Sequence, residues 1–135
     1  MRIKKQEERW FEVEGDPDGA RIKIKHLNPG EITDIMDSVF KQTIVYRTHG
    51  DEMRPEFTQE TDKRKDREMT LTASVVGWEN FFDRNDKPLK CTPENVIRAS
   101  REIEGFNDLV TEFRNRLAKD IIAEDVKEEK DLEKN

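Results

Sequence analysis

The sequence is poor in the residues from which most catalytic and metal sites are built. It contains one cysteine, two histidines and six glycines. Cys91 alone can form neither an internal disulfide nor a cysteine metal site, and His26 and His49 do not occur in a spacing that places two ligands on one helix face. With so few glycines, a glycine-rich phosphate loop is not expected. The sequence therefore predicts no catalytic, cofactor-binding or metal-binding residues and a protein that is not an enzyme.

Long apolar runs and net positive charge are missing as well. No stretch approaches the ~18 apolar residues that would span a bilayer, and residues 1–6 lack the apolar run of a signal peptide. The formal net charge is −6, so the chain as a whole has no general affinity for nucleic acid phosphates. The one basic cluster, at 63–67, is interrupted by Asp66 and reads as a solvated helix turn. We expect a cytoplasmic protein that binds neither membranes nor nucleic acid.

The apolar residues that are present indicate a thin core. Charged residues make up 41% of the chain and hydrophobic types 33%, below the ~45–50% apolar share of an ordinary soluble domain. Each aromatic side chain buries ~150–250 Å², so the seven phenylalanines and two tryptophans should mark the core.

The N-terminal segment predicts an antiparallel hairpin. Residues 9–14 include aromatic and β-branched side chains, and residues 20–27 alternate, with isoleucines on one side and basic residues on the other. The Gly-Asp-Pro-Asp-Gly segment at 15–19 supplies the backbone angles that a reversing loop needs. One face of this hairpin should contact solvent.

A helix is predicted to start at Asn28. Asn28 is a capping residue, Pro29 occupies the first helical position, and Glu31 lies where it completes a capping box. Five apolar residues follow at helical spacing, and we expect them to form the buried face of this helix. They are Ile32, Ile35, Met36, Val39 and Phe40.

The segment from 42 to 60 leaves two alternatives open. Residues 43–48 favour a strand, 49–52 a turn and 54–58 a return strand, in which Pro55 is typical of an edge position. A protruding hairpin and a mobile loop fit equally well, and either would be available to a partner.

The second half of the chain predicts three helices. The first covers 61–82, with Leu71, Val75, Trp78 and Phe82 at steps of four, three and four residues. A short helix opens at Thr92-Pro93-Glu94 and ends before Gly105. The last helix carries one apolar stripe, formed by Phe106, Leu109, Val110, Phe113, Leu117, Ile121 and Ile122.

These elements predict an α+β fold. An N-terminal antiparallel β-hairpin or small sheet is expected to pack against a mainly α-helical remainder of about four helices. Residues 1–122 should form a single domain, including the hairpin or loop at 42–60. Residues 123–135 are mainly charged and should form a flexible tail.

The aromatic cluster at 78–82 offers the clearest candidate for partner binding. On a helix, Phe81 would point about a quarter-turn away from the stripe that holds Trp78 and Phe82. Either all three side chains pack into the core, or Phe81 and its neighbours anchor a partner. The candidate partner-binding residues, with those of the last helix, are Trp78, Phe81, Phe82, Leu109, Phe113 and Leu117.

Two stretches resemble the phage tail assembly chaperones. The first is Gly19–Glu31, a strand ahead of an Asn-Pro-x-Glu helix start. The second runs from Val76–Asn80, with its Trp-Glu pair, through a polar loop to Pro88–Asn95, with its Thr-x-Glu-Asn helix start. The resemblance as a whole covers about residues 10 to 120, and neither 42–60 nor the acidic tail matches the family pattern.

The resemblance implies a protein encoded beside the tail tube and tape-measure genes of siphophage-like viruses or prophages. Such a protein coats the tape-measure protein in the host cytoplasm, helps tail tube subunits to assemble on it, and is absent from the mature virion. Related chaperones can be extended by a translational frameshift. Self-association into a homo-oligomer is compatible with this role.

Two other functions remain open from the sequence. One is a head–tail connector or tail completion protein that stays in the particle. The other is a small acidic regulator that binds a host protein, a role that net acidity suits if the target is a nucleic-acid enzyme.

Overall fold

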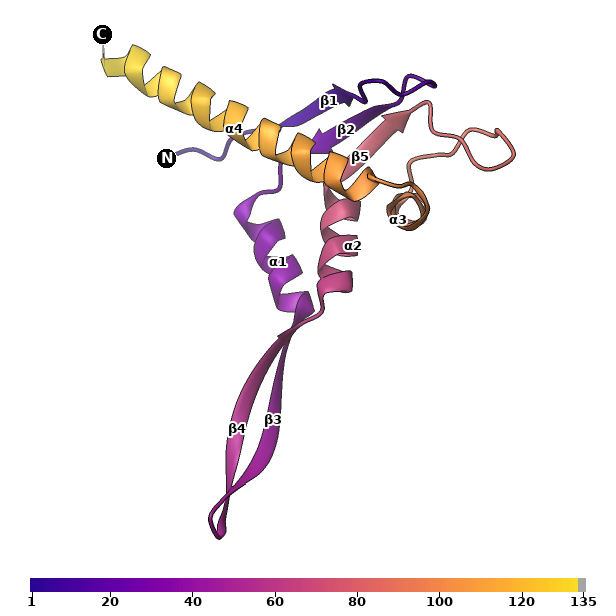
Figure 1. The fold of residues 1–135 in the computed structure, drawn as a ribbon. Helices are drawn as coiled ribbons and strands as arrows, with labels where there is room; N and C mark the ends of the chain where they lie inside the picture. The colour runs from indigo at the N-terminus through magenta and orange to yellow at the C-terminus, as the bar shows by residue number, and fades with distance from the viewer. Residues whose placement is uncertain (134–135) are drawn as a thin grey trace. The chain divides into compact units, whose positions relative to one another are not determined.

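The computed structural model describes residues 1–133 and has the predicted α+β fold (Figure 1). The chain forms two compact units. The sheet unit comprises residues 1–27 and the described residues from 71 onward, and the hairpin unit comprises Asn28–Thr70. The elements, in chain order, are β1 (Glu8–Glu12), β2 (Arg21–Lys25), α1 (Pro29–Val39), β3 (Phe40–His49), β4 (Glu52–Thr61), α2 (Lys63–Ser74), β5 (Val75–Glu79), α3 (Pro93–Glu102) and α4 (Phe106–Glu133).

The sheet unit is built on the predicted N-terminal hairpin. β1 and β2 pair antiparallel, with Phe11 opposite Ile22. In the connecting loop, the Asp16 carboxylate accepts hydrogen bonds from the backbone N–H groups of Asp18 and Ala20, at 3.1 and 2.9 Å. The isoleucines of β2 are fully buried, and its basic residues are partly exposed, as the alternation predicts.

A third strand, β5, replaces the second half of the helix predicted over 61–82. The helix α2 ends at Ser74, and Val75–Glu79 pairs antiparallel with β2. Ile22 faces Trp78, but Ile24 faces Val75, because a bulge at Val76 places an extra residue in β5. Val75 and Trp78 therefore lie three residues apart and are both buried. Such a spacing imitates one helical turn, which explains the wrong prediction.

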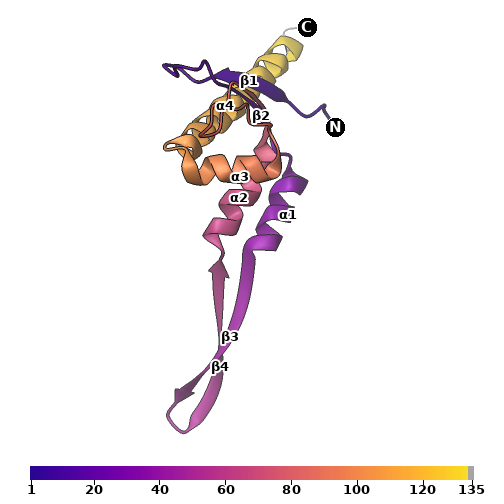
Figure 2. The same ribbon diagram turned by 90° about the vertical axis from the view of Figure 1, so that its right-hand side faces the viewer.

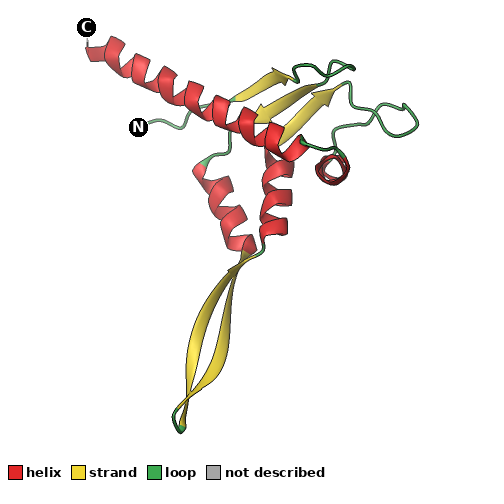
Figure 3. Ribbon diagram, viewed as in Figure 1, coloured by secondary structure: helices red, strands yellow, loops and turns green. Residues whose placement is uncertain are grey.

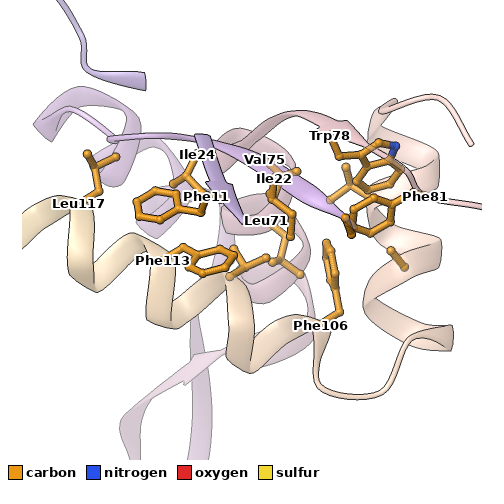
Figure 4. Close-up of a cluster of buried hydrophobic side chains, with 14 residues drawn as sticks. Phe11, Ile22, Ile24, Leu71, Val75, Trp78, Phe81, Phe106, Phe113 and Leu117 are labelled. Atoms are coloured by element: carbon orange, nitrogen blue, oxygen red, sulfur yellow. The ribbon is translucent and has the colours of Figure 1, made fainter. Parts of the chain in front are cut away.

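The core of the sheet unit lies between the sheet and α4 (Figure 4). Phe11 of β1 stacks on Phe113 of α4, with ring centroids 4.7 Å apart. α3 packs beside α4 and adds Val96 and Ala99 to the same cluster. The apolar stripe predicted for the last helix is therefore the one that covers the sheet, up to Ile121, whereas Ile122 is exposed.

The aromatic cluster at 78–82 differs from the helical prediction. Asn80 adopts a positive φ of 62° directly after β5 and redirects the chain. Phe81 then turns inward and stacks on Trp78, with centroids 4.3 Å apart, while Phe106 meets both rings edge-on. Phe81 is only 8% exposed, and Phe82 is 40% exposed. The helical geometry assumed for this cluster, with Phe82 on the stripe of Trp78 and Phe81 pointing away from it, was wrong because Val75–Glu79 is a strand. Of the three aromatics that one alternative placed in the core, Trp78 and Phe81 are buried and Phe82 is not.

In the hairpin unit, α1 starts with the predicted capping box. The Asn28 side chain accepts a hydrogen bond from the Glu31 N–H at 2.9 Å, and the Glu31 carboxylate accepts one from the Asn28 N–H at 3.1 Å. The predicted buried stripe is only partly buried. Ile35 and Val39 are covered, whereas three of its members are exposed. The exposed members are Ile32, Met36 and Phe40.

The segment 42–60 has the hairpin structure, the first of the two alternatives. β3 and β4 are each ten residues long and pair along their whole length, from Phe40 opposite Thr61 to His49 opposite Glu52 (Figures 2 and 3). Gly50 lies in the turn with φ of 66°, a conformation that strains other residues. A hydrogen bond of 2.9 Å from the Asp62 N–H to the Val39 carbonyl oxygen closes the base of the hairpin.

The helix α4 continues through most of the segment expected to form a flexible tail. Residues 123–133 are helical, and 134–135 lie outside the described residues. Ion pairs connect the N-terminal part of the chain to this part of α4, from Arg9 to Glu124 at 3.5 Å and from Lys4 to Asp125 at 3.0 Å. Good helix formers such as Glu, Lys and Ala occupy much of the segment, so little apolar burial is needed to continue the helix.

The two adjacent phenylalanines provide a test of the core. Phe81→Ala should lower the free energy of unfolding by ~3–5 kcal/mol, because it removes a buried ring and leaves a cavity. Phe82→Ala, the matched control, should cost no more than ~1 kcal/mol, because its ring is partly in solvent. Urea denaturation of both variants measures the difference, and equal losses would contradict the burial of Phe81.

Candidate protein-interaction surface

Most of the residues predicted to bind a partner lie in the core. Trp78, Phe81, Phe113 and Leu117 are buried, and Leu109 packs against the same cluster. The Trp78 indole N–H donates a hydrogen bond of 2.8 Å to the Leu89 carbonyl oxygen. Five of the six residues therefore take part in core packing, four of them buried and Leu109 partly buried.

Phe82 alone among these six residues is exposed, at the side of an open hollow of about 210 Å³. Glu102 lines the same hollow and forms ion pairs of 2.7 Å with both Arg84 and Arg98. The hydrogen bond from Arg98, aided by Arg84, lowers the pKa of Glu102. Both oxygens of the Glu102 carboxylate are thus paired, and the three side chains together keep one positive charge.

A larger surface lies in the hairpin unit, where β3 and β4 have two unlike faces. Side chains alternate between the faces along each strand, and residues directly opposite each other share a face. The register places Ile44 opposite Phe57 on one face and Val45 opposite Glu56 on the other. These pairs assign every residue of the hairpin to a face.

The first face, here called the apolar hairpin face, carries no charged residue at its ten positions. Its five large apolar side chains are 47–70% exposed. Patches of this kind on soluble proteins mark interaction sites. The ten residues are Phe40, Gln42, Ile44, Tyr46, Thr48, Met53, Pro55, Phe57, Gln59 and Thr61.

The opposite face is charged and internally paired. Glu56 accepts a contact of 3.1 Å from the Arg47 guanidinium and one of 3.2 Å from the His49 ring. Arg54 lies 3.5 Å from Glu52 on the same face. Exposed pairs of this kind contribute little stability, but they give this face a strongly hydrated surface. The hairpin therefore separates apolar and charged side chains onto its two sides.

The apolar hairpin face was missed from the sequence, although a signal for it was there. In 40–48, every second residue beginning with Phe40 is uncharged, and the same holds in 53–61 beginning with Met53. The two sets coincide on one face only once the strand register is known. The structure shows this register: the turn at 50–51 places His49 opposite Glu52, so that the two uncharged sets lie on the same face.

Other kinds of site find no support among residues 1–133. These residues contain no group of three or more histidine, cysteine or acidic side chains that could hold a metal ion. No helix in this part of the chain is long and apolar enough to cross a membrane. Partial burial raises the pKa of the Cys91 thiol, so the thiol stays protonated at neutral pH.

Comparisons of the chain with protein-family models, with curated proteins and with solved structures found no match.

The exposure of the apolar hairpin face leads to a direct prediction. The folded protein should enhance the fluorescence of an apolar dye such as anilinonaphthalene sulfonate, and Ile44→Lys should reduce that enhancement. Val45→Lys is the matched control, because its side chain lies on the charged face opposite Glu56. Titrations of the three proteins with dye measure the difference, and an equal response from both variants would count against a binding surface on this face.

Proposed function

We propose that this protein is a phage tail assembly chaperone and that the apolar hairpin face is its client-binding surface. Two observations support the proposal. The sequence resembles that family in the segments Gly19–Glu31 and Val76–Asn95. The face itself is the observation on which the binding mode depends, because it exposes five large apolar side chains on a structured hairpin without a single charge.

The proposed client is an apolar helical segment of the tape-measure protein, and the tail tube protein is its partner in assembly. A strand of ten residues spans about 33 Å, which equals about six turns of α-helix. A helix presents apolar anchors at steps of three and four residues, and a long uncharged face can accept a row of them. The face therefore suits a long helical client better than a compact ligand.

The surrounding charges fit a protein that binds its client reversibly. Contact through a partly apolar face forms and breaks without covalent change, and the net charge of −6 opposes nonspecific aggregation of the protein. In this role the protein performs no catalysis, acts in the host cytoplasm during assembly, and leaves before the virion is complete.

The proposal is tested by coexpression with the tape-measure protein encoded nearest to this gene. The wild-type chain should copurify with the tape-measure protein and keep it soluble. Ile44→Lys should reduce the amount recovered by roughly tenfold or more, a loss of about 1.4 kcal/mol in binding. Val45→Lys should behave as the wild type does, because it changes the charged face only.

Three results would contradict the proposal. The first is no copurification with the tape-measure protein. The second is retention of this chain in purified virions, found by mass spectrometry, which would favour a head–tail connector or tail completion protein. The third is that the apolar hairpin face binds a host protein and no tail protein, which would favour a small acidic regulator.

A further inference from the structure

We propose that, in the absence of a client, a second copy of this chain covers the apolar hairpin face, and that the two hairpins pack face to face about a two-fold axis. The inference rests on the proposed function for the identity of the client, but the pairing itself follows from the hairpin. In this proposal the client-free protein is a dimer, here called the waiting dimer, held together by the face that binds the client.

The hairpin would be stabilised by another apolar surface packed on its apolar face. A two-stranded sheet without further packing is marginally stable in water, yet β3 and β4 pair along ten residues each. All ten residues of the face are exposed in the single chain. An apolar surface brought against this face would exclude water from it and favour the paired strands.

The charge pattern makes a second copy a suitable cover. In a two-fold interface the same patch occurs on both partners, so a charge near the axis meets its own copy and repels it. The apolar hairpin face has no charge at any of its ten positions, in a chain of which 41% is charged. Two copies of this face can therefore meet without charge repulsion. The opposite face carries Lys41, Arg47 and Arg54 as well as glutamates, and these charged side chains favour contact with water.

The size of the face indicates a weak, exchangeable dimer. An aromatic side chain buries ~150–250 Å², the aliphatic ones less, and the five large apolar side chains of this face are 47–70% exposed. Covering them would therefore remove on the order of 500 Å² per copy from water. Two copies would then bury on the order of 1,000 Å², near the lower limit of specific interfaces. A client that covers more of the face can displace such a partner.

Pairing between faces is favoured over pairing between strand edges. The edges of the two-stranded sheet also offer backbone groups to another strand. An edge-to-edge arrangement, however, would extend the sheet and leave the five large apolar side chains in water on a wider surface. Packing of the two faces, about 10 Å apart as in layered sheets, covers them instead.

Sedimentation equilibrium on the purified full chain, without any tail protein, tests the proposal. The wild type should pass from monomer to dimer as its concentration rises through the micromolar range. Ile44→Lys and Phe57→Lys should each weaken the dimer by roughly tenfold or more. Val45→Lys should dimerise as the wild type does. Far-ultraviolet circular dichroism on each variant checks that it remains folded.

Hydrogen exchange provides a second measurement that requires no substitution. Backbone amides of β3 and β4 should exchange more slowly at concentrations where the dimer forms, whereas those of the central strand β2 should not change. A wild type that stays monomeric at high micromolar concentration would overturn the dimer. So would a dimer that Ile44→Lys leaves intact, because the copies would then meet through edges or another surface.

The outcomes separate the two proposals. A monomeric protein that still captures the tape-measure protein through Ile44 would refute the waiting dimer and leave the chaperone function in place. A dimer that dissociates on Ile44→Lys but never binds a tail protein would refute the chaperone function and leave the dimer.

Discussion

The sheet unit depends on the central position of β2. This strand pairs with β1 on one side and β5 on the other, and its isoleucines lie in the core cluster with residues of α4. A shift of one residue in its register would turn Ile22 and Ile24 toward solvent and its basic residues toward the core. The bulge in β5 allows Val75 and Trp78 to meet both isoleucines. The core thus requires this one alignment of three strands.

The hairpin unit uses the same alternation with a different result. In β2, the apolar side is covered by α4, so the alternation produces a core. In β3 and β4, the apolar side is exposed, so the alternation produces a surface. The contrast distinguishes residues that stabilise the fold, such as Phe81 and Phe113, from those available for contact, such as Ile44 and Phe57. Because the chain has few large apolar residues, five of them exposed together on one face indicate a binding surface.

The proposed client binding and the proposed dimer both use that surface. A client helix and a second copy would occupy the same uncharged face, so each excludes the other. Self-pairing would keep the face from nonspecific contact while the protein accumulates, and a client with a larger apolar surface would release it. Exchange between client and second copy requires that neither contact is too strong to dissociate. The modest area of the face is consistent with weak contacts.

The α+β class, the first hairpin and the capped start of α1 followed from the sequence alone, because each rests on local chemistry. Alternation defines β2, and the capping box of Asn28 and Glu31 marks a helix start through contacts within four residues. The end of α2 and the strand β5 did not follow, because a bulged strand and a helix can share the spacing of Val75 and Trp78.

The side to which Phe81 turns was decided only in the tertiary structure, by the redirection of the chain at Asn80. The apolar hairpin face was decided there as well, by the register of β3 against β4. Local patterns specify which side chains share a face of one strand. Which strands lie side by side, and whether anything covers that face, depends on contacts between residues distant in the chain.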